Sequence, residues 1–289
     1  MTRPCVLFVG RATFDAVYSV DQFPAEDTKI FAREMRAAPG GPALNAAITH
    51  ALLGGKAVLM SAVGWGTWAA PIHAELERLG IELIDLAAGT WYETPLTTVL
   101  VNAAKSTRTI VNPPQAGVEL KGFSGWDVSW GEAPGVVLTD GFHLKETLPL
   151  LAACREGGAA LCLDGGSWKP GTAELAPLLT AAICSERFAV PGEGGDADST
   201  IGWLVENGVP HVAVTRGARA ILGWDRGRRF EIDVARIDAV DTLGAGDVLH
   251  GAFCHYFARR EAFGPAMRLA AEIATRSCRG LGIRSWMEF

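Results

Sequence analysis

The chain has 289 residues, of which 49% are hydrophobic and 20% are charged, a balance typical of globular proteins and too apolar for a disordered chain. Lysine and arginine total 26 against 32 aspartates and glutamates, and the net charge of −6 argues against binding to nucleic acid or to an anionic membrane. The longest uncharged run, residues 57–74, contains Gly64, Gly66 and Pro71 and is not expected to span a membrane. The apolar run at 5–9 is typical of a first strand rather than a signal peptide, so we expect a cytoplasmic protein.

The cysteines do not form a recognisable pattern. No C-x-x-C pair is present, and their neighbours are mostly apolar, which favours packing roles over a disulfide framework or a zinc site. The chain also lacks a fixed-period repeat and a low-complexity linker. We therefore expect residues 1–289 to form a single domain.

Short apolar runs alternate with helical periodicity along most of the chain. The predicted buried strands are 5–10, 57–63, 136–140, 159–164, 181–185 and 211–215. The predicted helices are 43–53, 68–79, 145–156, 172–180, 198–207, 245–260 and 265–279. This alternation predicts an α/β fold, a doubly wound and mainly parallel sheet flanked by helices, with ligands at the carboxyl ends of the strands.

Two segments interrupt the alternation. Residues 17–37 and 94–111 alternate polar and apolar side chains as strands do and leave no room for crossover helices, so we place inserted strands at about 12–38 and 92–113. A few exposed strands cannot bury both of their faces alone, so they are expected to cover the ligand site or to pair with another subunit. We favour a lid over a hairpin without function.

The strongest local signal is the glycine-rich segment 241–247, which precedes a buried helical pattern. The free amides of Gly244, Ala245 and Gly246, together with the helix dipole, favour a site for developing negative charge. Asp247 would lie in the first helical turn, where it could accept a proton from an attacking hydroxyl. The alternative is an ordinary helix start with no catalytic role.

A second glycine-rich segment lies near the N-terminus. Gly40 and Gly41 expose backbone amides just before the predicted helix 43–53, and Asn45 lies one turn into that helix on the same side. An amide side chain beside bare backbone suits a polyhydroxylated ligand. Alone, the pattern is more typical of a helix start whose asparagine caps or is exposed.

Together these two segments resemble the two signatures of the ribokinase-like (PfkB) family of carbohydrate kinases. The resemblance extends over nearly the whole chain and includes the first strand with Asp15, the inserted strands and the C-terminal segment 278–282. It implies a doubly wound α/β domain with a small β lid, and transfer of the γ-phosphoryl group of ATP to a sugar hydroxyl. ATP and Mg²⁺ are the implied cofactors, and a dependence on K⁺ is left open.

The resemblance also implies roles for individual residues. The catalytic group comprises the base Asp247 and the anion-binding amides of Gly244, Ala245 and Gly246. The sugar-binding residues would be Asp15, Gly40, Gly41 and Asn45. The ATP-binding residues would be Thr215, Gly217, Gly244, Gly246, Cys278 and Gly280.

Two departures from the family pattern concern the metal and the sugar. The family's N-x-x-E motif should fall near 185–188, where Ser185 and Phe188 replace the asparagine and the glutamate. Glu186 or Asp164 could then contact Mg²⁺ through water, although either is equally well an ordinary carboxylate at a strand end. The segment 64–69 lacks the aspartate that is common in the family, and it does not form a dinucleotide-binding fingerprint either.

The acceptor is the least determined part of the prediction. The C-terminal motifs most resemble ketohexokinase and bacterial keto-sugar kinases, in which Lys29 and Asn112 would match residues that bind an anionic sugar. The candidates are a keto-hexose, a ribose-like sugar, a sugar phosphate and a sulfosugar. The alternatives are a nucleoside kinase of the same superfamily and a non-catalytic sensor of sugar or nucleotide. We expect a homodimer formed through the lid, with no nucleic-acid or membrane partner.

Overall fold

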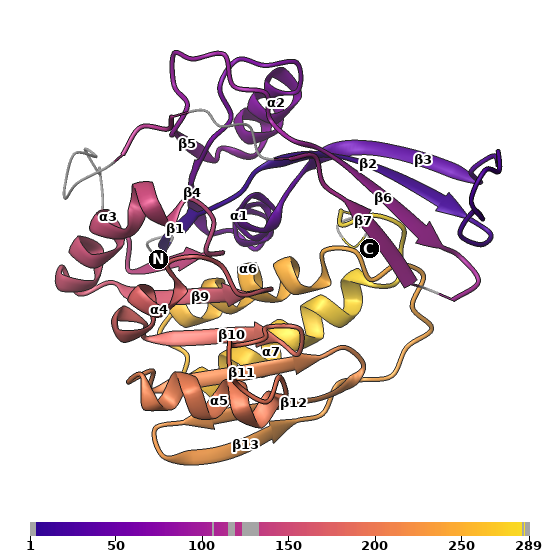
Figure 1. The fold of residues 1–289 in the computed structure, drawn as a ribbon. Coiled ribbons are helices and arrows are strands. Elements are labelled where there is room, and N and C mark those ends of the chain that lie inside the picture. Colours follow the sequence, from indigo (N-terminus) through magenta and orange to yellow (C-terminus); the bar gives the residue numbers. More distant parts are fainter. Residues whose placement is uncertain (1–3, 106, 115–118, 123–132, 285, 287–289) are drawn as a thin grey trace.

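The computed structural model describes residues 4–105, 107–114, 119–122, 133–284 and 286, and it contains two separate sheets (Figure 1). The larger is a nine-stranded sheet in which neighbouring strands follow the order β13-β12-β11-β10-β9-β8-β1-β4-β5. The chain begins near its middle and extends first to one side and then to the other, which confirms the predicted doubly wound fold. In sequence order its strands are β1 Cys5–Val9, β4 Lys56–Ser61, β5 Glu82–Asp85, β8 Val136–Thr139, β9 Ala160–Gly165, β10 Ala181–Ser185, β11 His211–Arg216, β12 Arg219–Asp225 and β13 Arg228–Ile232.

The central strands are parallel and mostly apolar, as is typical of strands whose two faces are both covered. Every residue of β1 and β8 is buried. At one edge, β12 and β13 form an antiparallel hairpin that the sequence analysis did not predict. The short edge strand β5 was not predicted either, because its residues are mostly half-buried and lack a continuous apolar run.

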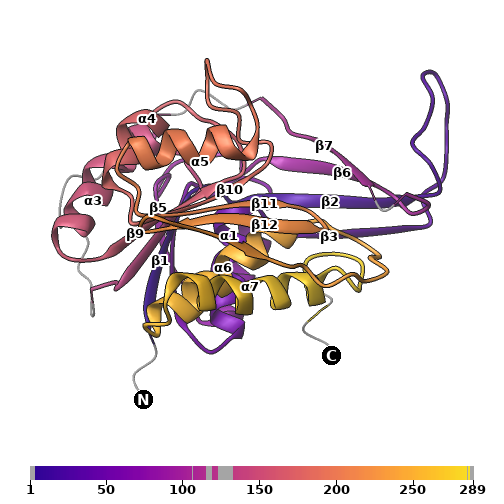
Figure 2. The ribbon, with the colours of Figure 1, turned by 90° about the horizontal axis from the view of Figure 1, so that it is seen from below.

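Helices cover both faces of the large sheet (Figure 2). One face packs against α1 Pro42–Leu52, α2 Ala69–Leu79, α6 Ala245–Ala258 and α7 Phe263–Ser277. The opposite face packs against α3 Leu144–Glu156, α4 Thr172–Leu175 and α5 Ala197–Glu206. The helix predicted over 172–180 is shorter than expected, because Pro177 falls in a single 3₁₀ turn, Ala176–Leu178, that follows α4. Among the described residues, no helix is long and apolar enough to cross a membrane.

The two predicted insertions form a separate four-stranded sheet in the order β3-β2-β6-β7. Its strands are β2 Thr13–Val20, β3 Glu34–Gly40, β6 Leu96–Asn102 and β7 Thr107–Val111. This small sheet lies on the side toward which β9, β10 and β11 point (Figure 1). Its inner face buries Val17, Val99 and Val101 against Leu243, which directly precedes the glycine-rich turn.

Three arginine hydrogen bonds connect the small sheet to the rest of the molecule. On β7, Arg108 Nη1 donates to Thr242 Oγ1 at 2.8 Å. On the other edge, Arg36 Nη1 donates to the carbonyl of Leu281 at 2.9 Å, and Arg284 Nη2 donates to the carbonyl of Pro39 at 2.8 Å. Both outer strands of the small sheet therefore contact the segments that flank α6 and α7.

The packing of α1 against α6 requires a glycine. A Cβ atom on Gly251 would lie 2.3 Å from the carbonyl oxygen of Ala46 and 2.7 Å from Thr49 Cβ, whereas a Cβ on Gly202 of α5 would meet open space. We expect Gly251→Ala to destabilise the protein by about 1–3 kcal/mol through overpacking. Gly202→Ala should instead stabilise it by about 0.5–1 kcal/mol, because alanine is the better helix former. Urea unfolding of both variants measures the difference, and equal midpoints would contradict the close α1–α6 contact.

Candidate active site

The turn before α6 presents backbone amides at the N-terminus of a buried helix. Gly244 has a left-handed φ of 67°, and a Cβ atom there would lie 2.0 Å from Ile283 Cδ1. The Asp241 carboxylate holds the turn by accepting from the amides of Leu243 at 2.8 Å and Gly282 at 3.0 Å. Helix N-termini with free amides favour bound anions.

The three predicted anion-binding amides are not equivalent. The Ala245 amide donates to the carbonyl of Thr242 at 3.3 Å. Within the described chain, the amides of Gly244 and Gly246 make no backbone hydrogen bond of this kind. Gly246 is exposed, and a Cβ atom there would meet nothing within 4 Å. The amides of Gly244 and Gly246 are therefore the ones best placed to donate hydrogen bonds to a bound anion.

Asp247 lies in the first turn of α6 beside Asn45 of α1. Asn45 Nδ2 donates to Asp247 Oδ2 at 2.8 Å, so the two predicted residues meet although they are far apart in the sequence. Burial raises the pKa of Asp247 to about 7, and the negative charge of Asp164 adds to this effect. Asn45 Oδ1 is buried and has no hydrogen-bond partner among the described residues, which leaves an acceptor for a ligand hydroxyl.

The two candidate metal contacts lie in different surroundings. Asp164, at the end of β9, is buried and lies 3.3 Å from Nδ1 of His250. The same His250 nitrogen lies 2.7 Å from the carbonyl of Gly246. Glu186 is 42% exposed at its side chain and forms an ion pair with Arg219. Among the described residues there is no cluster of three or more metal-ligating side chains. Asp164 is the more enclosed of the two candidates, and it is the one whose charge acts on Asp247.

Asp15 faces the site from the inner side of the small sheet. Its Oδ1 accepts from Thr13 Oγ1 at 2.6 Å, and a Cβ atom on Gly40 would lie 2.0 Å from its Oδ2. Burial raises the pKa of Asp15, although the positive charges of Arg284 and Arg11 oppose this. The charge of Asp15 also acts on Asp247, so both carboxylates belong to one site.

Gly41 allows the close approach that forms this side of the site. Its φ is 97°, and a Cβ atom there would lie 2.5 Å from the carbonyl oxygen of Arg11. Of the two residues predicted to contact an anionic sugar, Asn112 lies near Asp15, because its Oδ1 accepts from Thr97 Oγ1 at 3.0 Å and Thr97 pairs directly with Asp15. Lys29 is exposed in the 21–33 loop, which both views place at the end of the small sheet that projects away from the large sheet (Figures 1 and 2).

The predicted ATP-binding residues lie at the neighbouring strand ends and at the end of α7. Thr215 is near the end of β11, and Gly217 follows in the β11–β12 turn with a φ of 63°. Cys278 ends α7; its thiol lies 3.4 Å from the carbonyl of Ala274, and its own carbonyl accepts from the amide of Val240 at 2.9 Å. Gly280 is half-buried just beyond. Any contact that Cys278 makes with a nucleotide would therefore involve its backbone or its surroundings more than its thiol.

Sequence reasoning missed two residues on the acceptor side of the site. Asp140, directly after β8, is buried, and its carboxylate accepts from the amides of Arg11 at 2.8 Å and Phe142 at 2.9 Å. Burial raises the pKa of Asp140 to about 7. Arg11, directly after Gly10, is also buried. Their positions just after two adjacent parallel strands were the available signal, because the carboxyl ends of such strands share one edge.

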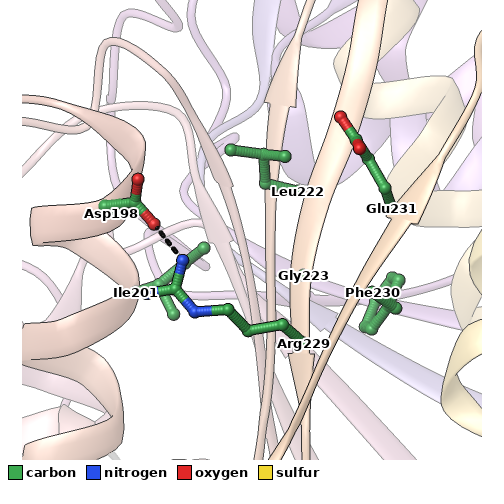
Figure 3. Close-up of a pocket in the computed structure, with 7 residues that line it drawn as sticks. All are labelled: Asp198, Ile201, Leu222, Gly223, Arg229, Phe230 and Glu231. Atoms are coloured by element: carbon green, nitrogen blue, oxygen red, sulfur yellow. Dashed lines mark hydrogen bonds and ion pairs between the residues drawn. The ribbon is translucent and has the colours of Figure 1, made fainter.

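A shallow surface pocket lies elsewhere, between α5 and the β12–β13 hairpin (Figure 3). An ion pair of 2.6 Å between Asp198 and Arg229 crosses it. The lining residues are Asp198, Ile201, Leu222, Gly223, Arg229, Phe230 and Glu231. None of them is a predicted site residue, so this pocket is separate from the site around Asp247.

Comparison with known proteins identifies the class of enzyme. Residues 4–287 match the family described as pfkB family carbohydrate kinase, and the chain belongs to this family. It is therefore a carbohydrate kinase, a phosphotransferase with an alcohol group as acceptor.

Relatives and solved structures agree over almost the whole chain. A deoxyribokinase of Salmonella typhi is 24% identical over 97% of this chain and 94% of its own length. Ribokinase from Giardia lamblia superposes with a TM-score of 0.81 and 16% identity, covering 99% of this chain and 96% of that one. The Arabidopsis thaliana ribokinase, solved in complex with ribose and ATP, has a TM-score of 0.72 and 18% identity, and the match covers 100% of both chains.

The narrower resemblance to ketohexokinase needs correction. Ketohexokinase of Mus musculus is 28% identical, but over only 38% of this chain and 37% of its own. The deoxyribokinase match extends over nearly the full length of both proteins. The motifs that suggested ketohexokinase are short, and glycine-rich turns of this kind are shared because the phosphate chemistry is shared. The chain as a whole is more like ribokinases and deoxyribokinases.

Proposed function

We propose that this chain transfers the γ-phosphoryl group of ATP to a hydroxyl group of a small sugar. The observation that carries the proposal is the position of Asp247. It follows the free amides of Gly244 and Gly246 in the same helix start, it accepts a hydrogen bond from Asn45, and the charge of Asp15 acts on it. Sugars of ribose or deoxyribose size are the favoured class of acceptor, because the deoxyribokinase and the ribose complex come from relatives matched along their whole length.

The acceptor side offers fixed hydrogen-bonding groups. Asp15 can accept from two sugar hydroxyls, and such charge-assisted bonds orient a ring strongly. The unpartnered Asn45 Oδ1 can accept from a third. Because Asn45 also donates to Asp247, a hydroxyl bound at Asn45 lies next to the carboxylate that would take its proton.

Phosphoryl transfer requires alignment and charge stabilisation more than covalent chemistry. In this proposal Asp247 accepts the proton of the attacking hydroxyl, and the amides of Gly244 and Gly246 stabilise the charge on the transferred group. Thr215, Gly217, Cys278 and Gly280 border the space for the nucleotide. The inner face of the small sheet packs on Leu243 and helps to exclude water from the turn.

The residues present fit a magnesium ion that is held mainly by phosphates and water. Mg²⁺ usually keeps several waters and needs only one or two protein carboxylates beside substrate phosphates. Asp164 is the enclosed carboxylate nearest to Asp247, and Glu186 is the more exposed alternative. When bound, the ion would neutralise phosphate charge.

Replacing the base tests the proposal directly. We expect Asp247→Asn to lower kcat by about 10²–10⁴-fold, the contribution typical of a general base, because the amide cannot accept the proton. ADP release should be measured with Mg²⁺-ATP and ribose, deoxyribose, fructose, fructose 6-phosphate, sulfofructose and adenosine, with ATP affinity measured by calorimetry.

Asp198→Asn is the matched control, since Asp198 is an exposed aspartate in the separate pocket. It should leave both quantities unchanged. An Asp247→Asn variant with full turnover would refute the assignment of the base, and turnover of adenosine alone would favour a nucleoside kinase.

The raised pKa of Asp247 predicts the pH dependence. The base must be ionised, so kcat/KM should be low at acidic pH and should rise as the pH increases through about 7. Asp164→Asn removes a negative charge that raises this pKa, so the rise should move to lower pH. Glu186→Gln should not move it, because Glu186 is paired with Arg219 and is not among the main charges acting on Asp247. An unmoved profile in Asp164→Asn would contradict the coupling of the two carboxylates.

The outer face of the small sheet supports the prediction of a homodimer. The pairing registers place Tyr18, Met35 and Leu100 side by side on this face, with Val111 on the same face of β7. Met35 is 49% exposed and Val111 is 58% exposed. Exposed apolar strands of this kind favour pairing with another subunit.

We expect light scattering to show a dimer, and the double variant Met35→Lys, Val111→Lys to shift it to monomer. Trp65→Lys changes an exposed apolar residue outside the small sheet and should leave the dimer intact. A wild-type monomer at working concentration would rule out the proposed interface.

A further inference from the structure

Arg11 is a buried cation that the proposed mechanism does not use. It directly follows β1 and Gly10, and only 8% of the residue is exposed. Its backbone amide donates to Asp140, but its side-chain atoms Nε and Nη2 are buried and have no hydrogen-bond partner among the described residues. Buried charged groups are normally paired, so an unpaired guanidinium indicates a missing partner.

The two unpartnered nitrogens define the shape of that partner. Nε and Nη2 lie on the same edge of the planar guanidinium group, and their N–H bonds point in parallel. This edge matches two oxygens of one carboxylate or phosphate group, which arginine binds in bidentate fashion. A single neutral hydroxyl would satisfy only one of the two donors.

The nearby carboxylates do not take this place. Asp140 accepts from the backbone amides of Arg11 and Phe142, and Asp15 accepts from Thr13. The charges of Asp140 and Asp15 act on Arg11, but neither carboxylate makes a hydrogen bond to its Nε or Nη2 atoms.

A second cation lies close to Arg11. The Arg11 Cζ atom is 5.1 Å from the centre of the Phe142 ring, and Lys169 Nζ is 4.6 Å from the same centre. Among the described residues, the hydrogen bonds of Lys169 Nζ go to neutral groups, the carbonyl of Ser167 at 3.2 Å and its hydroxyl at 3.4 Å. The nearby His143 is neutral at pH 7, because burial lowers its pKa to about 4 with help from the charge of Arg11. Arg11 and Lys169 thus bring two positive charges to the Phe142 ring, beside the buried Asp140 carboxylate.

The position of Arg11 relative to Asp247 gives the orientation of the ligand. Arg11 borders the same side of the site as Asn45, because a Cβ atom on Gly41, the residue before α1, would lie 2.5 Å from the Arg11 carbonyl oxygen, and the charge of Asp15 acts on both Arg11 and Asp247. A small sugar whose reactive hydroxyl lies at Asp247 and whose ring contacts Asp15 would direct its opposite end toward Arg11.

We propose that the acceptor is an anionic sugar whose carboxylate or phosphate group is bound by the Nε and Nη2 edge of Arg11, with Lys169 adding positive charge. This inference rests on the proposed sugar kinase function and narrows its acceptor class. Arg11 is then the residue that selects an anionic acceptor over a neutral one of the same size.

The test is binding measured apart from turnover. Calorimetry with Mg²⁺ and a non-hydrolysable ATP analogue would use wild type, Arg11→Gln, Arg11→Lys and the control Arg268→Gln, an exposed arginine of α7. The carboxylate probes are gluconate and 2-dehydro-3-deoxygluconate, the phosphate probes are fructose 6-phosphate and fructose 1-phosphate, and the neutral probes are glucose, fructose and ribose. The two anionic sets distinguish a sugar acid from a sugar phosphate.

We expect at least one anionic probe to bind wild type tenfold or more tightly than the neutral sugars. Arg11→Gln should lose at least tenfold of that affinity, Arg11→Lys should retain part of it because a point charge replaces the fork, and Arg268→Gln should lose none. If Arg11→Gln does not fold, an unchanged affinity in Arg11→Lys would count against the bidentate contact.

Three results would overturn the inference: a neutral sugar as the best ligand with unchanged affinity in Arg11→Gln, anion binding that is insensitive to Arg11, or no anionic probe bound while the ATP analogue still binds.

Turnover assays on the same proteins separate this inference from the proposed function. An anionic sugar that binds through Arg11 but accepts no phosphoryl group would refute the kinase mechanism at Asp247 and leave the binding site standing. A neutral sugar phosphorylated equally well by wild type and Arg11→Gln would support the kinase mechanism at Asp247 and refute the anion-binding role of Arg11.

Discussion

The close contact between α1 and α6 is the constraint on which the site depends. Gly251 allows the two helices to approach until its Cα faces the carbonyl of Ala46, and at the N-terminal ends of the same helices Asn45 donates to Asp247. The first helix follows the glycine pair of the proposed sugar side, and the second follows the glycine-rich turn of the proposed phosphate side. One packing interface thus fixes the distance between the two halves of the reaction.

Electrostatics make this region unusual for a protein interior. Asp15, Asp140 and Asp247 all have raised pKa values because burial disfavours their charged forms, and Asp164 adds repulsion at Asp247. Free amides at the start of α6 and the Nε and Nη2 atoms of Arg11 supply positive potential without a hydrogen-bond partner among the described residues. A site of this kind is incompletely satisfied until ligands arrive, which is the arrangement that favours binding of charged and hydroxylated molecules.

The sequence predicted most of the fold because its periodicity was strong. The apolar runs of β1 and β8 and the polar–apolar alternation of β6 left little choice of structure. The β12–β13 hairpin was missed because its residues mix charged and apolar side chains at a sheet edge, where burial on one face is weak.

The site was predictable to the extent that glycines mark it. Gly41 and Gly244 have positive φ angles and close neighbours, so a glycine at each position is a structural requirement that the sequence displays directly. Arg11 and Asp140 were not predictable in this way, because a lone arginine or aspartate after a strand is usually solvated or paired. Only the three-dimensional structure shows that Nε and Nη2 of Arg11 are enclosed without a partner. Similarly, only the structure shows that Nδ1 of His250 lies near both Asp164 and the Gly246 carbonyl.

The arginines that hold the small sheet have a consequence for its motion. Arg108, Arg36 and Arg284 reach across to a hydroxyl and two backbone carbonyls, so these contacts join a charge to a neutral dipole rather than to an opposite charge. Dissolved salt screens pairs of opposite exposed charges far more than it weakens such short bonds to neutral groups. The small sheet should therefore stay seated over the turn across a wide range of ionic strength, while long-range attraction of an anionic acceptor toward the site weakens as salt is added.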